Sequence, residues 1–289
     1  MDTNGCAVVT AGFIYLDDNG VTIIASDSAV IGESYDLGGE TYQVVDSTML
    51  YNMVAANEDV TKVVTTHVTN MFRLFQDANN NNQDISSWDV SNVTDMRYLF
   101  IYNWEFNQDL SSWDVSNVTQ MDLMFYEAES FNQEIGNWNV GNVISFYQFM
   151  YRANSFNKDV SNWDVSSATS TVSMFSGCKY FNQDLSGWDV SKVTEMDGMF
   201  GGTSFDQDIS SWDVSKVTDM SEMFGGTPFN QDISSWDVSN VTHMNNMFNS
   251  TENFNQDLSA WDMSNVKGIQ GMFGYSKAFN QNISTWVMP

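Results

Sequence analysis

The ten-residue phrase FNQDLSSWDV at residues 106–115 returns along most of the chain. A tryptophan marks each copy, and successive tryptophans are 24 or 25 residues apart. They are Trp88, Trp113, Trp138, Trp163, Trp188, Trp212, Trp236, Trp261 and Trp286. A fixed period of this length is the signature of a repeat protein, in which each unit packs only on its neighbours. The period therefore constrains the fold more strongly than any other feature of the sequence.

Each unit carries a few apolar residues at fixed positions, such as Phe106, Leu110 and Trp113. These are too few for a separate core, so the units must stack to bury them. We expect a short strand over 106–113 and one helical or 3₁₀ turn over 118–125, where apolar residues have helical spacing. The predicted fold class is an α/β repeat solenoid, a leucine-rich-repeat-like coil of 24–25-residue rungs.

A weaker copy of the unit, with Val63 in the place of tryptophan, begins near residue 59. The solenoid is therefore expected to cover residues 59–289 in about nine rungs. Residues 20–58 do not follow the period and are expected to form a small α+β unit that caps the first rung. Residues 1–19 are interpreted as an N-terminal apolar segment or linker.

Within the predicted cap, residues 20–25 and 35–45 have the composition of strands. A Gly38-Gly39 pair inside the second segment is typical of a hairpin turn. Residues 46–57 read as an amphipathic helix with Asp46 or Ser47 as its N-cap.

The chain carries 37 acidic and 10 basic residues, a formal charge of −27. Such a surface repels nucleic acid and anionic lipid, so nucleic-acid binding is excluded as a function. The opening residues have no basic segment, and their apolar run is interrupted, so neither a secretory signal nor a membrane span is recognised. A mature fragment whose signal had been removed would look the same. Cys6 and Cys178 are the two cysteines, too few for a disulfide framework.

Catalytic motifs are not recognisable in the sequence. His67 and His243 occupy different positions of distant units, and neither is paired with a nucleophile in a known spacing. We therefore expect a protein that is not an enzyme and has no catalytic residues.

Acidic residues recur at two positions of the unit and would form two rows in a stack. Carboxylates that repeat at the spacing of neighbouring strands repel one another, and calcium prefers oxygen ligands of this kind. Calcium is therefore the candidate cofactor. The alternative is that each aspartate accepts backbone N–H bonds from its own turn. The candidate metal ligands are Asp109, Asp159, Asp184, Asp189, Asp208, Asp213, Asp232 and Asp237.

The repeated tryptophans and methionines are predicted to form the core, because they recur with every unit beside other apolar positions. Aromatic residues that interrupt the repeat are better candidates for ligand contact. A single exposed tyrosine is also common on surfaces without a ligand. The candidates are Tyr102, Trp104, Tyr126, Tyr147, Tyr151, Tyr180 and Tyr275.

The repeated phrase FNQDISSWDVSNVTDM and the lead-in over residues 18–66 resemble the BspA-like leucine-rich-repeat surface proteins of bacteria, in the branch also seen in mycoplasma lipoproteins and marine Bacteroidetes. Together the two similarities cover residues 18–289. The resemblance implies an extracellular or cell-surface location and a role in adhesion or recognition, with a surface protein or glycan as partner. It implies no catalytic residues.

A second hypothesis is self-assembly into a fibre or surface layer, with calcium as a candidate switch. The last rung has no predicted cap, and the apolar segment 6–16 could add a strand to a neighbouring copy. The alternative is that this segment is a fragment of an upstream domain or an added N-terminal strand of the cap. The residues assigned to this assembly are Val8, Val9, Phe13, Ile14, Phe279, Ile283 and Trp286.

Overall fold

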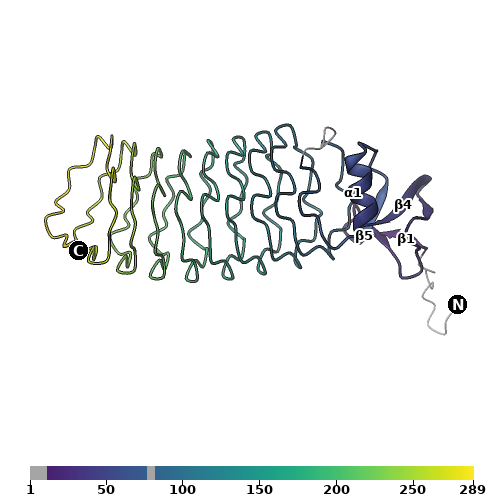
Figure 1. Ribbon diagram of the computed structural model, residues 1–289, viewed down its shortest axis with the longest axis horizontal. Helices are drawn as coiled ribbons and strands as arrows, with labels where there is room; N and C mark the ends of the chain where they lie inside the picture. The colour runs from purple at the N-terminus through teal and green to yellow at the C-terminus, as the bar shows by residue number, and fades with distance from the viewer. Residues whose placement is uncertain (1–11, 77–81) are drawn as a thin grey trace.

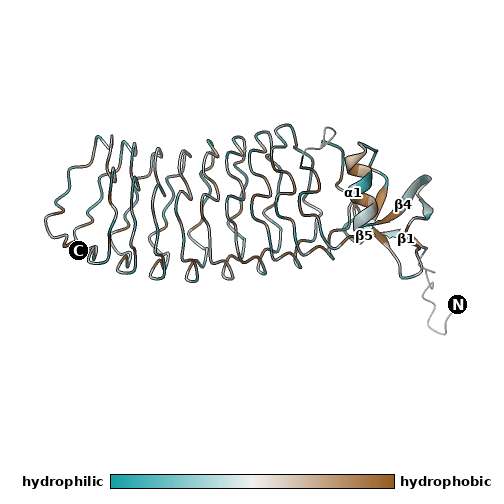
Figure 2. Cartoon of the chain, in the orientation of Figure 1, coloured by the Kyte–Doolittle hydropathy of each residue, from teal (hydrophilic) through white to brown (hydrophobic). Residues whose placement is uncertain are grey.

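The computed structural model describes residues 12–76 and 82–289 (Figure 1). Successive coils stack along the longest axis of the molecule, and a small unit of strands with one helix closes the N-terminal end. Apolar and polar residues alternate around every coil (Figure 2). Among the described residues, none of the helices is long and apolar enough to cross a membrane.

The N-terminal unit contains two small sheets and a helix. Strands β1 (Ile14–Leu16) and β2 (Ile23–Ala25) form an antiparallel pair. Strands β3 (Ser34–Leu37), β4 (Glu40–Asp46) and β5 (Val63–His67) form a second sheet in that order, in which β4 and β5 are parallel. Helix α1 (Ser47–Ala55) connects β4 to the segment that leads into β5.

Two local predictions in this unit are confirmed. Gly38 and Gly39 form the two-residue turn between β3 and β4, with φ of 62° and 90°, values that glycine adopts without the strain of a side chain. Asp46 is the N-cap of α1, and its side chain accepts the Met49 N–H at 2.8 Å. The helix buries Leu50 and Val54 against the main core.

The N-terminal unit is larger than the predicted cap. Ile14, in the segment interpreted as an apolar segment or linker, pairs with Ala25 and is buried in a small cluster with Val44 and Val64, as expected if this segment is an added strand of the cap. Strand β5 comes from the weaker copy of the repeat and belongs to the sheet of this unit. Its Thr65 hydroxyl donates to the Asp89 carbonyl at 2.9 Å, so β5 joins the N-terminal unit to the first rung.

Neighbouring rungs are joined by backbone hydrogen bonds along one side. The N–H groups of Met96, Tyr98 and Phe100 donate to carbonyls of the next rung at 2.8–3.0 Å. Isolated parallel bridges mark this contact, for example from Asp95 to Gln120. After β5, strand-like pairing in the described rungs is limited to these isolated bridges, and these rungs contain neither a regular strand nor a helix.

The strand predicted over 106–113 is therefore not present, because Asp109 and the Leu110–Trp113 turn bend that segment. The predicted helical turn over 118–125 is also absent. Met124 donates its N–H to the carbonyl of Met121, but Leu123 has a φ of 54°, which interrupts a right-handed helix. The segment forms turns with a left-handed third residue, the geometry of a type II turn.

Positive φ values recur ten and fourteen residues after the tryptophans, as at Leu123 and Glu127 after Trp113. Glycine fills both positions after Trp188, as Gly198 and Gly202. An L-residue in this conformation costs about 1–2 kcal/mol. These turns bring the chain back toward the next rung while its N–H groups bond across to that rung.

The core runs continuously through the stack. Eight of the nine repeated tryptophans, Trp88 to Trp261, are buried, which confirms their predicted place in the core. Rings of one rung stack on rings of the next, as Trp88 does on Trp113 at 6.4 Å between centroids. Each repeated indole N–H also donates to a backbone carbonyl of the preceding coil, as Trp113 does to Ile85 at 3.2 Å.

We expect Gly202→Ala to lower the free energy of unfolding by about 1 kcal/mol, because Gly202 has a φ of 70° that alanine adopts only with strain. An added Cβ would meet nothing closer than 4.0 Å there, so backbone conformation alone opposes it. Gly187→Ala is the matched control, because its φ is outside the left-handed region and no atom lies within 4 Å of the added Cβ. Urea unfolding of both variants measures the difference, and equal stabilities would contradict this account of the turn.

Candidate functional site

The candidate calcium ligands lie in turns and accept bonds from them. In the row before each tryptophan, the carboxylates accept the backbone N–H of the serine two residues later at 2.9 Å, and this row contains Asp109, Asp159, Asp184, Asp208 and Asp232. In the row after each tryptophan the same bond measures 3.0 Å, and this row contains Asp189, Asp213 and Asp237. Both rows therefore have the local partners that turn chemistry predicts.

The serines also stabilise the charged forms of Asp184 and Asp189. The hydroxyl and then the backbone N–H of Ser191 hold the pKa of Asp189 below its usual range. For Asp184 the backbone N–H of Ser186 is the larger cause of a lowered pKa. Within residues 12–76 and 82–289, no three His, Cys, Asp or Glu side chains converge to hold a metal ion. Calcium binding by these rows stays a prediction.

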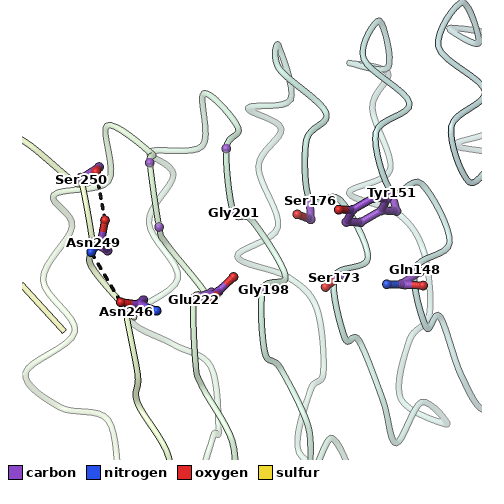
Figure 3. A pocket seen from close by; sticks show the side chains of 13 residues that line it. Gln148, Tyr151, Ser173, Ser176, Gly198, Gly201, Glu222, Asn246, Asn249 and Ser250 are labelled. Atoms are coloured by element: carbon purple, nitrogen blue, oxygen red, sulfur yellow. Dashed lines mark hydrogen bonds between the residues drawn. The ribbon is translucent and has the colours of Figure 1, made fainter. Parts of the chain in front are cut away.

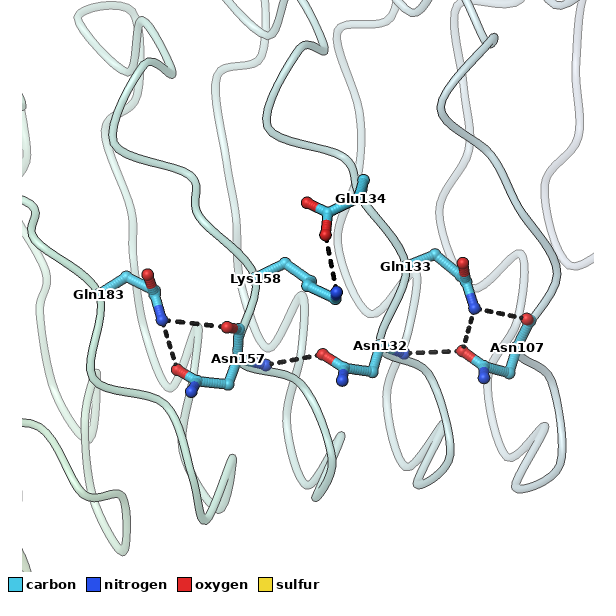
Figure 4. Close-up of polar contacts among 7 residues, drawn as sticks. All are labelled: Asn107, Asn132, Gln133, Glu134, Asn157, Lys158 and Gln183. Atoms are coloured by element: carbon cyan, nitrogen blue, oxygen red, sulfur yellow. Dashed lines mark hydrogen bonds and ion pairs between the residues drawn. The ribbon is translucent and has the colours of Figure 1, made fainter.

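A ladder of asparagines follows the polar face beside the first acidic row (Figure 4). The Asn132 N–H donates to the side-chain oxygen of Asn107 at 2.9 Å, and the Asn157 N–H donates to that of Asn132 at 3.1 Å. The next glutamine reinforces the contact, because the Gln183 amide donates to the Asn157 side-chain oxygen at 2.7 Å. The polar residues of the repeated phrase therefore bond one rung to the next.

Two departures from the repeat on this face compensate for one another. Lys158 stands where other rungs have glutamine, and Glu134 stands where the preceding rung has aspartate. The two side chains pair at 2.7 Å (Figure 4). An exposed pair of this kind contributes less than about 1 kcal/mol. The pair maintains a contact between the two rungs where the glutamine is missing.

Three of the predicted ligand-contact aromatics lie together in consecutive rungs. Tyr126 and Tyr151 stack at 4.8 Å with 14° between their planes, and Tyr102 meets Tyr126 edge-on at 5.4 Å. We call these three residues the tyrosine row. The other four candidates make no ring contact with other described residues, and all four are exposed: Trp104, Tyr147, Tyr180 and Tyr275.

The tyrosine row ends at a groove that crosses five rungs (Figure 3). Its volume is about 600 Å³. Tyr151 and Gln148 line one end, and Asn246, Asn249 and Ser250 line the other. Glycines occupy the middle, where five of them line the groove: Gly198, Gly201, Gly202, Gly225 and Gly226. We call this feature the glycine groove.

The sequence analysis missed the glycine groove. Its signal was the phrase GGT at 201–203 and again at 225–227, at the two places where the tryptophan spacing is 24 instead of 25. Thr203 and Thr227 are buried and bond the carbonyls of Phe200 and Phe224 at 2.7 Å, which closes the shorter turns.

Acidic groups lie along the middle of the glycine groove, and the Arg152 guanidinium lies over the Tyr151 ring at one end. Glu222 lines it, and Asp197 precedes Gly198 in the chain. Burial, with the nearby Asp219 charge as the next cause, raises the pKa of Asp197 to about 6. The groove therefore lies in a negative electrostatic field, which disfavours an anionic ligand.

The residues assigned to self-assembly are not all available for it. Val8 and Val9 lie outside the described residues. Ile14 is buried in the N-terminal unit, whereas Phe13 stacks on Tyr35 at 4.7 Å and stays exposed. At the other end of the chain, three residues are half-buried where their equivalents one rung earlier are buried: Phe279, Ile283 and Trp286.

We expect Asn157→Ala to lower the free energy of unfolding by about 1 kcal/mol, because the Asn182 N–H and the Gln183 amide lose their acceptor. Asn157→Asp is the matched control and should retain nearly all of the stability. The chain itself contains this replacement, since Asp206 accepts the Asn230 N–H at 2.9 Å at the equivalent position. Urea unfolding checks both, and equal losses would show that the acceptor has no effect.

We expect Asp189→Asn to keep the melting temperature close to that of the unchanged chain, and Asp189→Ala to lower it, because asparagine retains the acceptor for Ser191. The pKa of Asp189 is lowered in the folded chain, so its charge stabilises the fold above the unfolded pKa of about 4. That stability is lost as the pH falls through the folded pKa, so the difference between wild type and Asp189→Ala should shrink at pH 2.5.

The same melts with calcium and then with a chelator separate the turn from a metal site. A chelator-induced fall in melting temperature that is absent in Asp189→Asn would contradict a role confined to the turn. It would support a calcium site in this row.

Comparison with known proteins identifies a family of repeats. The family model described as "Mycoplasma protein of unknown function, DUF285" matches residues 46–161, 134–228 and 203–289. A search of curated proteins gave no match, and a search of solved structures gave none either. The three matches together extend over residues 46–289, which is most of the chain. The chain therefore belongs to the DUF285 family.

Proposed function

We propose that the chain is a non-enzymatic recognition or adhesion module, placed outside the cell or on its surface, that binds a protein or glycan. It would be a BspA-like leucine-rich-repeat protein, which agrees with the repeat phrase and with the mycoplasma-type family. Rungs of 24 or 25 residues, with parallel bridges between most neighbouring rungs, support the leucine-rich-repeat-like fold class.

The observation that carries the proposal is where the non-repeating residues lie. Ten residues after successive tryptophans the chain has Gln148, Ser173, Gly198, Glu222 and Asn246. Thirteen residues after them it has Tyr151, Ser176, Gly201, Gly225 and Asn249. All ten residues line the glycine groove (Figure 3).

Variation at these two positions contrasts with the uniformity of the others. Core positions repeat because packing restricts them, and the acidic positions repeat because turns require an acceptor. The residues that line the groove are restricted neither by packing in the core nor by the need for an acidic acceptor in a turn. Their side chains differ from rung to rung, and this is what recognition of a particular ligand requires.

Self-assembly is the alternative, and one observation favours it. Phe279, Ile283 and Trp286 are only half-buried, and either a following rung or another copy could cover them. Repulsion between chains of charge −27 opposes such contacts, and calcium is a candidate to screen it.

We expect the purified chain to be monomeric by light scattering, with calcium and with chelator, and to bind at least one ligand in screens of glycans, matrix proteins and whole cells. A monomer that binds nothing would overturn the recognition module. Oligomers that grow with concentration, and that disappear when Ile283 and Trp286 are replaced by polar residues, would favour assembly instead.

A further inference from the structure

The backbone conformation does not require glycine at two positions in the middle of the glycine groove. Gly201 and Gly225 have φ values outside the left-handed region, and an added Cβ would lie 3.3 and 3.4 Å from the Glu222 carbonyl oxygen, so the backbone would have to shift by only a few tenths of an ångström. The equivalent position carries Tyr151 and Ser176 in the preceding rungs, so the stack accommodates side chains there. The two glycines therefore leave open a space that the fold itself could fill.

Polar groups without internal partners line this space. The side chains of Gln148, Ser173 and Ser176 make no hydrogen bond with other residues of the described chain. A hydroxyl and an amide each donate and accept, so these groups can bond a ligand rich in hydroxyls. Asn249 and Ser250 bond one another at 3.0 Å at the far end and extend the polar lining.

An aromatic ring stands at the other end. Tyr151 lines the groove, and two neighbours hold its ring in place: Tyr126 stacks on it, and the Arg152 guanidinium, which also pairs with Glu127, lies 5.3 Å from its centroid. A fixed ring with a polar tip offers an apolar face for stacking beside a hydrogen-bonding group. A sugar ring has a complementary structure, with an apolar face of C–H groups and hydroxyls around its edge.

The backbone argues against a peptide strand as the ligand. The N–H groups of Gly198, Gly202 and Gly226 all donate to carbonyls of the next rung at 2.7 Å. These donors are therefore not available to pair with an added strand, which is the usual way an extended peptide binds a sheet. Recognition here must use side chains.

The charge of the groove restricts the ligand further. Glu222 within it and Asp197 beside it repel sulfated, phosphorylated or uronic-acid polymers. Five rungs at about 4.8 Å spacing make a groove of about 20 Å, enough for several sugar units in a row.

We propose that the glycine groove binds a neutral polysaccharide chain that runs along the stack, with one sugar stacked on Tyr151 and the following sugars lying over the glycines. This inference rests on the proposed recognition function and assigns it a site and a class of ligand. Ser173, Ser176 and Gln148 bond the hydroxyls of the sugars.

Native electrophoresis in gels that contain hydroxyethylcellulose, laminarin, galactomannan or polygalacturonate tests the proposal. At least one neutral polymer is expected to retard the chain, and polygalacturonate is not. Calorimetry with an oligosaccharide of the retarding polymer then measures the affinity of each variant.

Two groove variants and two matched controls locate the binding. Gly225→Trp fills the groove and Tyr151→Ala removes its ring, and each is expected to weaken binding at least tenfold. Gly187→Trp adds the same side chain at a position where no atom lies within 4 Å of the added Cβ. Tyr180→Ala removes an exposed tyrosine outside the groove. Both controls should bind as the unchanged chain does. Urea unfolding confirms that each variant is folded, and Tyr151→Ala tests the site even where the larger tryptophan does not fit.

Several outcomes would overturn the proposal: no retardation by any neutral polymer, equal retardation by polygalacturonate, or unchanged affinity in both groove variants. A protein ligand whose binding is lost in the groove variants would also overturn it, while leaving the recognition module in place. A chain that binds neither glycans nor proteins would fail both proposals together.

Discussion

The indole N–H of each repeated tryptophan bonds a backbone carbonyl in the preceding coil, and the stack depends on this contact. Trp88 reaches Val60 in this way, and the pattern continues to Trp286 and Leu258. A buried donor without an acceptor costs about 1–3 kcal/mol, so a rung cannot bury its tryptophan unless the coil before it is folded. Phenylalanine would fill much of the same volume without this requirement. Tryptophan therefore ties the packing of each rung to the register of its neighbour.

The polar phrase around each tryptophan supports the same contact from outside. Asparagine oxygens accept backbone N–H groups of the next rung, and aspartates close the turns on either side. The same residue types make these contacts in most rungs, which explains why the phrase repeats so closely. The side of each rung that is held mainly by backbone bonds is relieved of these constraints, and the glycine groove lies there.

Much of the fold could be predicted from the sequence, because it depends on period and on local turn chemistry. The burial of the tryptophans, the Gly38-Gly39 hairpin and the Asp46 cap were all predictable in this way. The strand over 106–113 was a wrong prediction, because the turn at Leu110–Trp113 was not recognised in an apolar-polar pattern. Of the candidate site, Tyr102, Tyr126 and Tyr151 were found as departures from the repeat. The groove beside them forms where glycines take the place of larger residues, and its shape becomes apparent only when the rungs are aligned in space.

The nearest-neighbour bonding of the rungs has a mechanical consequence. Because each rung is bonded only to the ones beside it, we expect a pull on the C-terminal side to detach the outer rungs one at a time. Every rung that detaches releases about 25 residues, or roughly 80 Å of extended chain. A chain built in this way lengthens in steps under tension, and the rungs nearer the N-terminal unit keep their structure while the outer ones absorb the extension.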